Sequence, residues 1–187
     1  MWTAGPLFDD LRRLGIASGD VLMVHAGLRS IGRLLNGPDT FIHALRLALG
    51  QAGTLMAYSD WNAEYEAMLN PDGSVPDSLR EEIAPFDPAR SPANRGNGSF
   101  PEFLRTTPGA LRSASPGPSC TALGPGAADL LANHPLDYGY GPGSPFARLC
   151  ALGGKVLLAG APLDTITLLH HAEHLAELPR KSKKIVE

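Results

Sequence analysis

The fold expected of this chain follows from one segment, GKVLLAGAPLDTITLLHHAEHLAE, residues 154–177. It begins with an apolar run, 155–159, which is bounded by glycines and predicts a buried strand. Gly160 and Pro162 break this run, and Asp164 stands where a helix N-cap is preferred. The residues that follow repeat with the period of an α-helix. The stretch therefore predicts a strand followed by a helix.

The predicted helix has an apolar side and a polar side. At about 100° per residue, the apolar side gathers Leu168, Leu169, Ala172, Leu175 and Ala176. The opposite side carries His170, Glu173, His174 and Glu177. An imidazole beside a carboxylate at this spacing suits a general base with an orienting acid. Two other interpretations stay open at this point: a solvated face without chemistry, and a zinc site, because H-x-x-E-H is the inverted zinc-peptidase signature.

The rest of the chain repeats the alternation of apolar strands and amphipathic helices. The patterns predict strands over 20–25, 54–58, about 119–123 and 155–159, and helices over 6–15, 38–49, 101–106, 127–134 and 144–152. The first two strands and the helix between them form a βαβ unit, whose strands should be parallel. We therefore expect one α/β domain, residues 1–187, around a mostly parallel central sheet.

The composition restricts the class of protein. The 187 residues suit one domain, and a formal net charge of −3 gives no bulk electrostatic basis for binding nucleic acid. Cys120 and Cys150 are too few for a disulfide framework, which favours a reducing compartment. The charged N-terminus does not resemble a signal peptide, and no apolar run approaches the roughly 18 residues of a membrane span. The sequence thus predicts a cytoplasmic protein without nucleic-acid or membrane partners.

An acidic insert interrupts the α/β pattern at about 59–100. Between residues 60 and 87 there are eight acidic residues and one base, Arg80, whereas the remainder has 11 acidic and 15 basic residues. Carboxylates pair with ammonium groups, and aromatic rings such as Trp61 stack on apolar ring faces. The insert therefore fits either a solubilising loop or a site for a polyvalent cation with a ring-shaped body.

The turn 27–32, GLRSIG, follows the first buried strand and is flanked by arginines. Glycines let backbone N–H groups approach phosphate oxygens, and the guanidinium groups of Arg29 and Arg33 offer forked donors. The turn is not a P-loop, because it lacks the G-x-x-x-x-G-K-[ST] pattern. It is compatible with a phosphate-bearing cofactor and also with an ordinary turn between a strand and a helix.

Taken together, these and other motifs resemble the aminoglycoside 3-N-acetyltransferases of the antibiotic-resistance type. The matching segments are GDVLMVHAGLRSIG (19–32), GP (37–38), GTLMAYSDW (53–61), PFDP (85–88), PGALRSASP (108–116) with Ser119, LDYGYG and SP within 136–145, and GKVLLAGAPLDTITLLHHAE (154–173). They cover essentially the whole chain in the family's order.

The resemblance implies a fold and a reaction. The fold is a three-layer α/β/α sandwich, the donor is acetyl-CoA, and the acceptor is the 3-amino group of a 2-deoxystreptamine ring. The essential histidine of the family matches His170, with Glu173 in the same L-H-x-A-E motif. Direct attack by the amine would need neither a cysteine nucleophile nor a metal. Family members continue beyond the position of Glu187, so the resemblance also implies that the C-terminal portion of the family domain is absent here.

The expected site residues follow from these arguments. The catalytic pair is His170 and Glu173. The coenzyme is expected on Gly27, Leu28, Arg29, Ser30, Ile31 and Gly32, with Ser113 and Ser119 nearby. The aminoglycoside is expected on Asp60, Trp61, Glu64 and Glu66. The alternatives are a zinc peptidase and a fragment that binds coenzyme A or the antibiotic without turnover.

Overall fold

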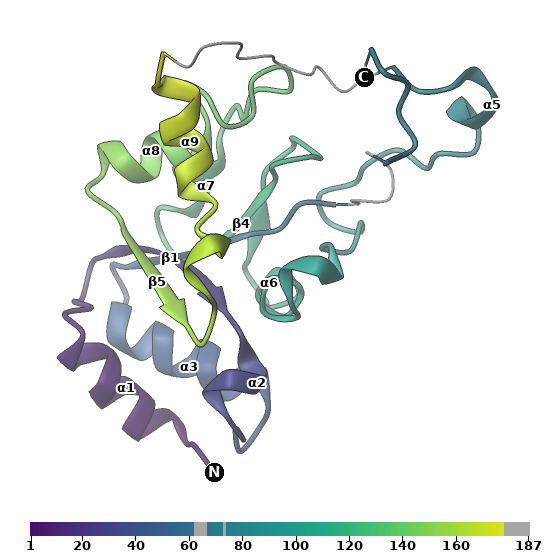
Figure 1. The fold of residues 1–187 in the computed structure, drawn as a ribbon. Helices are drawn as coiled ribbons and strands as arrows, with labels where there is room; N and C mark the ends of the chain where they lie inside the picture. The colour runs from purple at the N-terminus through teal and green to yellow at the C-terminus, as the bar shows by residue number, and fades with distance from the viewer. Residues whose placement is uncertain (62–66, 73, 178–187) are drawn as a thin grey trace.

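The computed structural model describes residues 1–61, 67–72 and 74–177. A five-stranded sheet runs through the molecule, and helices lie against both of its faces (Figure 1). Its strands are β1 (Val21–Ala26), β2 (Thr54–Tyr58), β3 (Leu111–Arg112), β4 (Cys120–Leu123) and β5 (Lys155–Ala159), in the spatial order β3-β4-β2-β1-β5. The four expected strands are confirmed to within one residue at each end, because each is a short apolar run between turn residues.

The helices also follow the expected pattern. They are α1 (Ala4–Arg13), α2 (Leu28–Ile31), α3 (Pro38–Leu49), α5 (Asp77–Arg80), α6 (Phe100–Arg105), α7 (Ala127–Leu131), α8 (Pro145–Ala151) and α9 (Leu168–Leu175), with the short 3₁₀ helices η1 (Arg95–Asn97) and η2 (Leu163–Thr165). Ser144 caps α8 by accepting from the Ala147 amide at 3.2 Å, as its position before a proline predicts. Within the described residues, no helix is long and apolar enough to cross a membrane.

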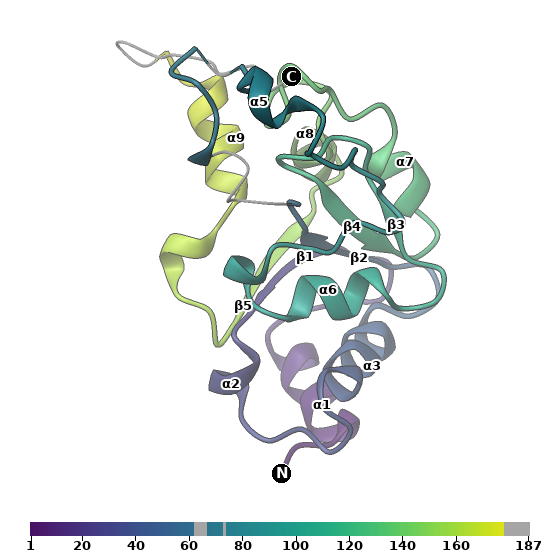
Figure 2. The same cartoon turned by 90° about the vertical axis from the view of Figure 1, so that its right-hand side faces the viewer.

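The alternation of side chains along the strands determines which helices cover each face. One face packs on α1, α3 and α6 and buries residues such as Leu22 and Val24 of β1. The other face packs on α7 and α8, with the first turn of α9, and buries Met23 and Met56. Figure 2 shows α1 and α3 on one side of the sheet and α7 and α8 on the other. Two apolar layers therefore enclose the sheet.

The expectation of a mostly parallel sheet is wrong, because the sheet is mixed. β1 pairs in parallel with β2 and with β5, as the βαβ unit predicts. β4, however, is antiparallel to β2, and β3 is antiparallel to β4. The hairpin of β3 and β4 needs only a short connection, whereas a parallel partner for β2 would need a crossover.

Two expectations for the region of α9 are also wrong. Asp164 does not cap the helix: it lies in η2, and α9 begins later with Thr167 at its cap position. The predicted apolar side of α9 is not the buried one, since Leu169 is 54% and Leu175 61% exposed while His171 is 6% exposed. The helix is turned this way because tyrosine rings from the loop before α8 pack against its histidines.

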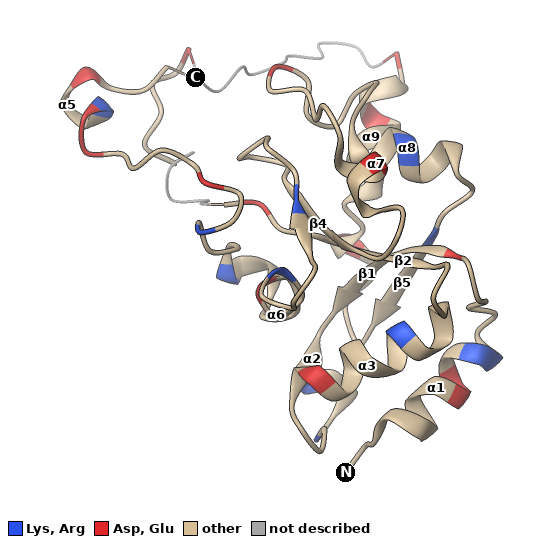
Figure 3. Cartoon of the chain, turned by 180° about the vertical axis from the view of Figure 1, so that it is seen from behind, with Lys and Arg blue, Asp and Glu red and all other residues tan. Residues whose placement is uncertain are grey.

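Much of the acidic insert lies away from the sheet. Between β2 and α6 the chain leaves the body of the molecule, and α5 lies at the far end of this excursion (Figure 1). Figure 3 shows acidic positions along it and around α5. Asp60 differs from these residues, because it lies two residues after the end of β2.

Candidate functional site

A cavity of about 530 Å³ opens at the carboxyl ends of β1, β2 and β5. Open α/β sheets place ligands at this edge, where the strands end and the loops begin. The last residues of β1 with Gly27, the end of β2 with Asp60, the loop 96–98, Tyr140, and the segment from Ala161 to His170 contribute its lining. Among the described residues that line it there are two aspartates, Asp60 and Asp164, and neither lysine nor arginine. The cavity therefore suits a cation better than an anion.

His170 and Glu173, the expected catalytic pair, are brought together at this cavity. His170 Nδ1 lies 2.9 Å from Glu173 Oε2, one helical turn away, and the imidazole lines the cavity. When Nδ1 carries the ring proton it donates to the carboxylate, and this leaves the lone pair of Nε2 free to accept a proton. Both side chains are about half exposed. The pair has the geometry of a general base with an orienting acid.

Tyr140 connects α9 to the sheet. Its ring centroid lies 5.2 Å from that of His170, and its carbonyl oxygen accepts a 2.6 Å hydrogen bond from His171 Nδ1. Its hydroxyl lies 2.7 Å from that of Tyr58, whose pKa is raised by burial and by the neighbouring Tyr140. Both tyrosines line the cavity. The orientation of α9 over the strand ends thus depends on Tyr140.

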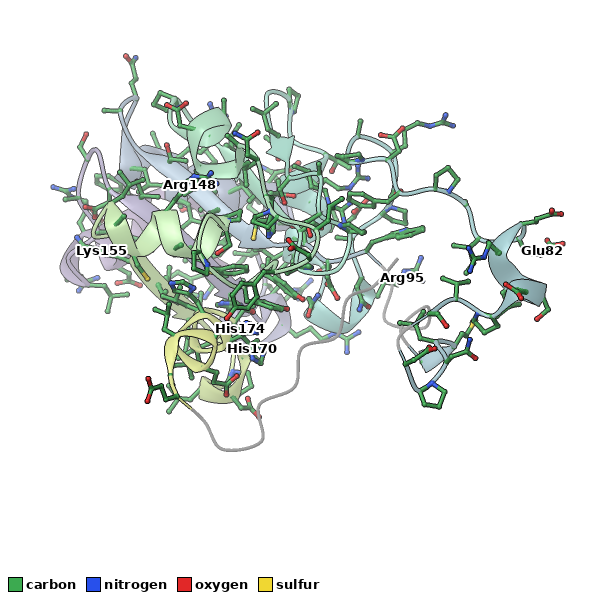
Figure 4. All side chains as sticks on the ribbon, turned by 90° about the horizontal axis from the view of Figure 1, so that it is seen from above. Glu82, Arg95, Arg148, Lys155, His170 and His174 are labelled. Carbon is green, nitrogen blue, oxygen red and sulfur yellow. The ribbon has the colours of Figure 1, made fainter. Side chains whose placement is uncertain are left out.

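The other histidines of α9 make different contacts. His171 is buried, although the apolar side expected of α9 is not. His174 packs on Tyr138 and Tyr140, with ring centroids 4.8 and 5.6 Å away, and its carbonyl oxygen accepts from the Tyr138 hydroxyl at 2.9 Å. Figure 4 shows His170 and His174 close together on α9, but His170 is the one that lines the cavity.

The turn expected to hold the coenzyme borders the cavity through Gly27. A Cβ atom on Gly27 would lie 2.4 Å from the Gly160 carbonyl oxygen, and one on Gly160 would lie 2.8 Å from Cβ of Ser30. These glycines therefore let the loop after β1 pack against the loop after β5. Arg29, Ser30 and Gly32 are exposed and accessible to a ligand, while the half-buried Leu28 and Ile31 pack on the core.

Ser113 and Ser119 are not brought to the cavity. The Ser113 hydroxyl accepts from the Cys120 amide and bonds to His134 Nδ1, both at 2.9 Å. The Ser119 hydroxyl donates to the Ser59 carbonyl at 2.6 Å. Both serines are at most 2% exposed and lie outside the cavity lining. Their hydroxyls hold the hairpin of β3 and β4, so the prediction that they contact the coenzyme finds no support.

The expected acceptor residues separate into three groups. Asp60 lines the cavity. Trp61 packs on Phe86, with ring centroids 5.7 Å apart, and its amide donates to the Pro116 carbonyl at 3.1 Å. It is not part of the cavity lining. Glu64 and Glu66 lie outside the described residues.

Several lining residues were missed by the reading of the sequence. His25 is half buried near the end of β1, and its Nε2 atom is buried without a hydrogen-bond partner among the described residues. Burial lowers the pKa of His25, so the ring is neutral at neutral pH. A lone histidine in an otherwise apolar strand, DVLMVH, was the available signal. Asn97 ends the short η1 and Tyr140 lies in the loop before α8, and neither segment is long enough for periodicity to predict where its side chains point.

Within the part of the chain that the structure describes, the H-x-x-E-H motif does not gather a metal site. Among residues 1–61, 67–72 and 74–177, no group of three or more His, Cys, Asp or Glu side chains could hold a metal ion. The first histidine of H-x-x-E-H is bonded to the glutamate of the same motif instead.

Comparison with known proteins finds a matching family and relatives that carry its name. The sequence profile of the family described as aminoglycoside 3-N-acetyltransferase matches residues 23–186. Aminoglycoside N(3)-acetyltransferase VIII of Streptomyces fradiae is 50% identical over 181 residues, which are 96% of this chain and 63% of that protein. The chain thus spans slightly less than two thirds of the length of this relative.

Solved structures agree with this relationship. A structure described as AAC-IIIb in a binary complex with CoASH is 59% identical and superposes with a TM-score of 0.92, over 95% of this chain and 66% of the other. A structure described as AAC-VIa bound to sisomicin is 42% identical, also with a TM-score of 0.92, over 97% of this chain and 68% of the other.

Proposed function

This chain belongs to the aminoglycoside 3-N-acetyltransferase family, and on that premise we propose that it transfers an acetyl group from acetyl-CoA to the 3-amino group of the 2-deoxystreptamine ring of an aminoglycoside antibiotic. The observation that carries the proposal is the His170–Glu173 pair at a cavity whose described lining is acidic. An aminoglycoside is a polycation, and its amine must lose a proton as it attacks.

His170 acts as the general base in this reaction. The amine nitrogen attacks the thioester carbonyl carbon, the carbonyl electron pair moves to oxygen, and the amine proton passes to His170 Nε2. The C–S bond then breaks, and the coenzyme A thiolate takes up the proton. Glu173 stabilises the imidazolium through Nδ1. A base positioned in this way accelerates a reaction by about 10²- to 10⁴-fold.

The donor binds beside the turn that follows β1. Gly27 forms the cavity wall, and Arg29 and Arg33 are exposed next to it, where they are available for phosphate groups. The CoASH complex of the AAC-IIIb structure supports coenzyme A as the donor.

The acceptor binds on the side of Asp60. An ammonium group of the antibiotic pairs with this carboxylate while the 3-amino group faces His170. The sisomicin complex of the AAC-VIa structure supports aminoglycosides as the acceptor class.

Product analysis on this chain tests the proposal. The chain is incubated with acetyl-CoA and sisomicin, thiol release is followed, and the acetylated nitrogen is located by NMR. Acetylation at the 3-amino group supports the proposal, with the His170→Ala variant as a control for uncatalysed transfer. Acetylation of another nitrogen would overturn the regiochemistry. Binding of both ligands without product would favour the alternative of a binding module without turnover.

A further inference from the structure

Asp60 is held by two asparagine side chains from a separate loop. Asn94 Nδ2 donates to Asp60 Oδ2 at 3.1 Å, and Asn97 Nδ2 donates to Asp60 Oδ1. The Asn94 amide also donates to the Asp60 carbonyl oxygen at 2.9 Å. The loop is therefore attached to both the backbone and the side chain of Asp60, and each carboxylate oxygen has its own donor.

The sequence PANRGNG explains why this loop presents two amides together. Asn94 Oδ1 accepts from the Gly96 amide at 2.9 Å, which starts the single turn η1. One 3₁₀ turn places residues three apart on the same side, so Asn94 and Asn97 face the same way. Gly98 follows with φ of +79° and ends the turn.

The chemistry of the two donors matters for a cation site. Arginine or lysine would fix the carboxylate equally well but would add a positive charge beside it. The asparagine amides orient it and add no charge. Asp60, Asn97 and His170 line the same cavity, so the carboxylate is fixed on the wall that the base also faces.

From these contacts we propose that Asn94 and Asn97 are positioning residues: their amides hold the Asp60 carboxylate in the orientation that receives an ammonium group of the acceptor. The inference rests on the proposed function and deepens it, because it assigns the acceptor's recognition to a preorganised carboxylate and not to the charge of the insert alone. Preorganisation raises affinity by removing the cost of ordering the side chain on binding.

Calorimetric titration with sisomicin tests the inference through Asn97, which is exposed and whose side chain donates to the Asp60 carboxylate. Asn97→Ala removes one amide donor from the Asp60 carboxylate, and sisomicin should bind about two- to tenfold more weakly because the carboxylate must then be ordered on binding. KM for sisomicin should rise by a similar factor while kcat stays within about twofold, because this contact serves ground and transition states alike. Affinity for coenzyme A should not change, which also shows that the variant is folded.

Two further variants distinguish an effect of the orientation of the Asp60 carboxylate from an effect of the negative charge at the site. Asn97→Asp keeps the shape but replaces a donor by a second carboxylate. If positioning governs binding, sisomicin binds more weakly; if only the number of negative charges matters, it binds more tightly. In an Asp60→Asn background, Asn97→Ala should have no further effect, because its influence passes through Asp60.

Asn70→Ala is the matched control, since Asn70 is an exposed loop asparagine whose Nδ2 donates to the Ser74 hydroxyl at 3.0 Å. Unchanged sisomicin affinity in Asn97→Ala, or tighter binding in Asn97→Asp, would overturn the inference while leaving the proposed function standing. Absence of sisomicin binding by the unaltered chain would overturn the proposed function, and this inference with it.

Discussion

The phenolic oxygens of Tyr58 and Tyr140 lie 2.7 Å apart, although 82 residues separate the two in the chain. Tyr58 ends β2, and Tyr140 lies in the loop before α8. Through this contact the sheet holds the residue that packs on His170. The position of the proposed base is therefore fixed by the sheet as well as by its own helix.

Tyr140→Leu should lower kcat with little change in the affinity for coenzyme A. Loss of the ring removes the contact with His170, and small misplacements of reacting groups can cost up to about 10²-fold in rate. Tyr140→Phe keeps the ring and removes only the hydroxyl pair, so its kcat should fall less. For each variant, steady-state kinetics would measure kcat, and calorimetric titration with coenzyme A would measure the affinity. Equal effects of the two substitutions would assign the role to the hydroxyl and not to the ring.

His170→Ala should lower kcat by about 10²- to 10⁴-fold, because it removes the proton acceptor. Its coenzyme A affinity should remain near that of the unaltered chain. His174→Ala is the internal comparison, since His174 lies one turn further on and packs on Tyr138. Single-turnover acetyl transfer would distinguish the two. A larger loss in His174→Ala would mean that the base has been assigned to the wrong histidine.

Arg29→Ala should weaken coenzyme A binding, and the loss should shrink as salt is added, since exposed charges are screened. Titration calorimetry at low and high ionic strength measures this directly. Arg46→Ala on the outer side of α3 is a suitable control, because Arg46 is exposed and lies outside the turn. Identical affinities for the Arg29→Ala and unaltered chains would remove Arg29 from the donor site.

His134 should make stability depend on pH. Its ring is buried, with Nε2 donating to the Gly139 carbonyl at 2.7 Å and Nδ1 bonded to Ser113, and burial lowers its pKa below the ordinary value of 6.5. The unfolded chain therefore takes up a proton at higher pH than the folded chain. The stabilisation is complete above about pH 6.5 and is lost as the pH falls toward the folded pKa, by at most about 1.4 kcal/mol per pH unit.

Urea unfolding at pH 7.5 and pH 5.5 checks this dependence. In His134→Gln, which cannot titrate, the loss of stability on acidification should be smaller than in the unaltered chain. His43→Gln is the matched control, since His43 is exposed on α3. If stability falls equally on acidification in His134→Gln and in the unaltered chain, other titrating groups cause the pH dependence.

Features with local causes could be predicted from the sequence alone. The strands over 54–58 and 155–159 and the helix over 38–49 have the predicted bounds, because apolar runs, Pro38 and Gly50 act over a few residues. The His170–Glu173 contact is also local, since a spacing of three in a helix brings the two side chains together.

Features that depend on distant partners could be seen only in the folded chain. The antiparallel hairpin of β3 and β4, the side of α9 that is buried, and the place of Ser113 and Ser119 depend on what packs against them. The same holds for Asp60, whose amide donors lie more than 30 residues away. A pattern along the chain records periodicity, but it carries no information on which loops meet, because those contacts are set by how the sheet and its helices pack.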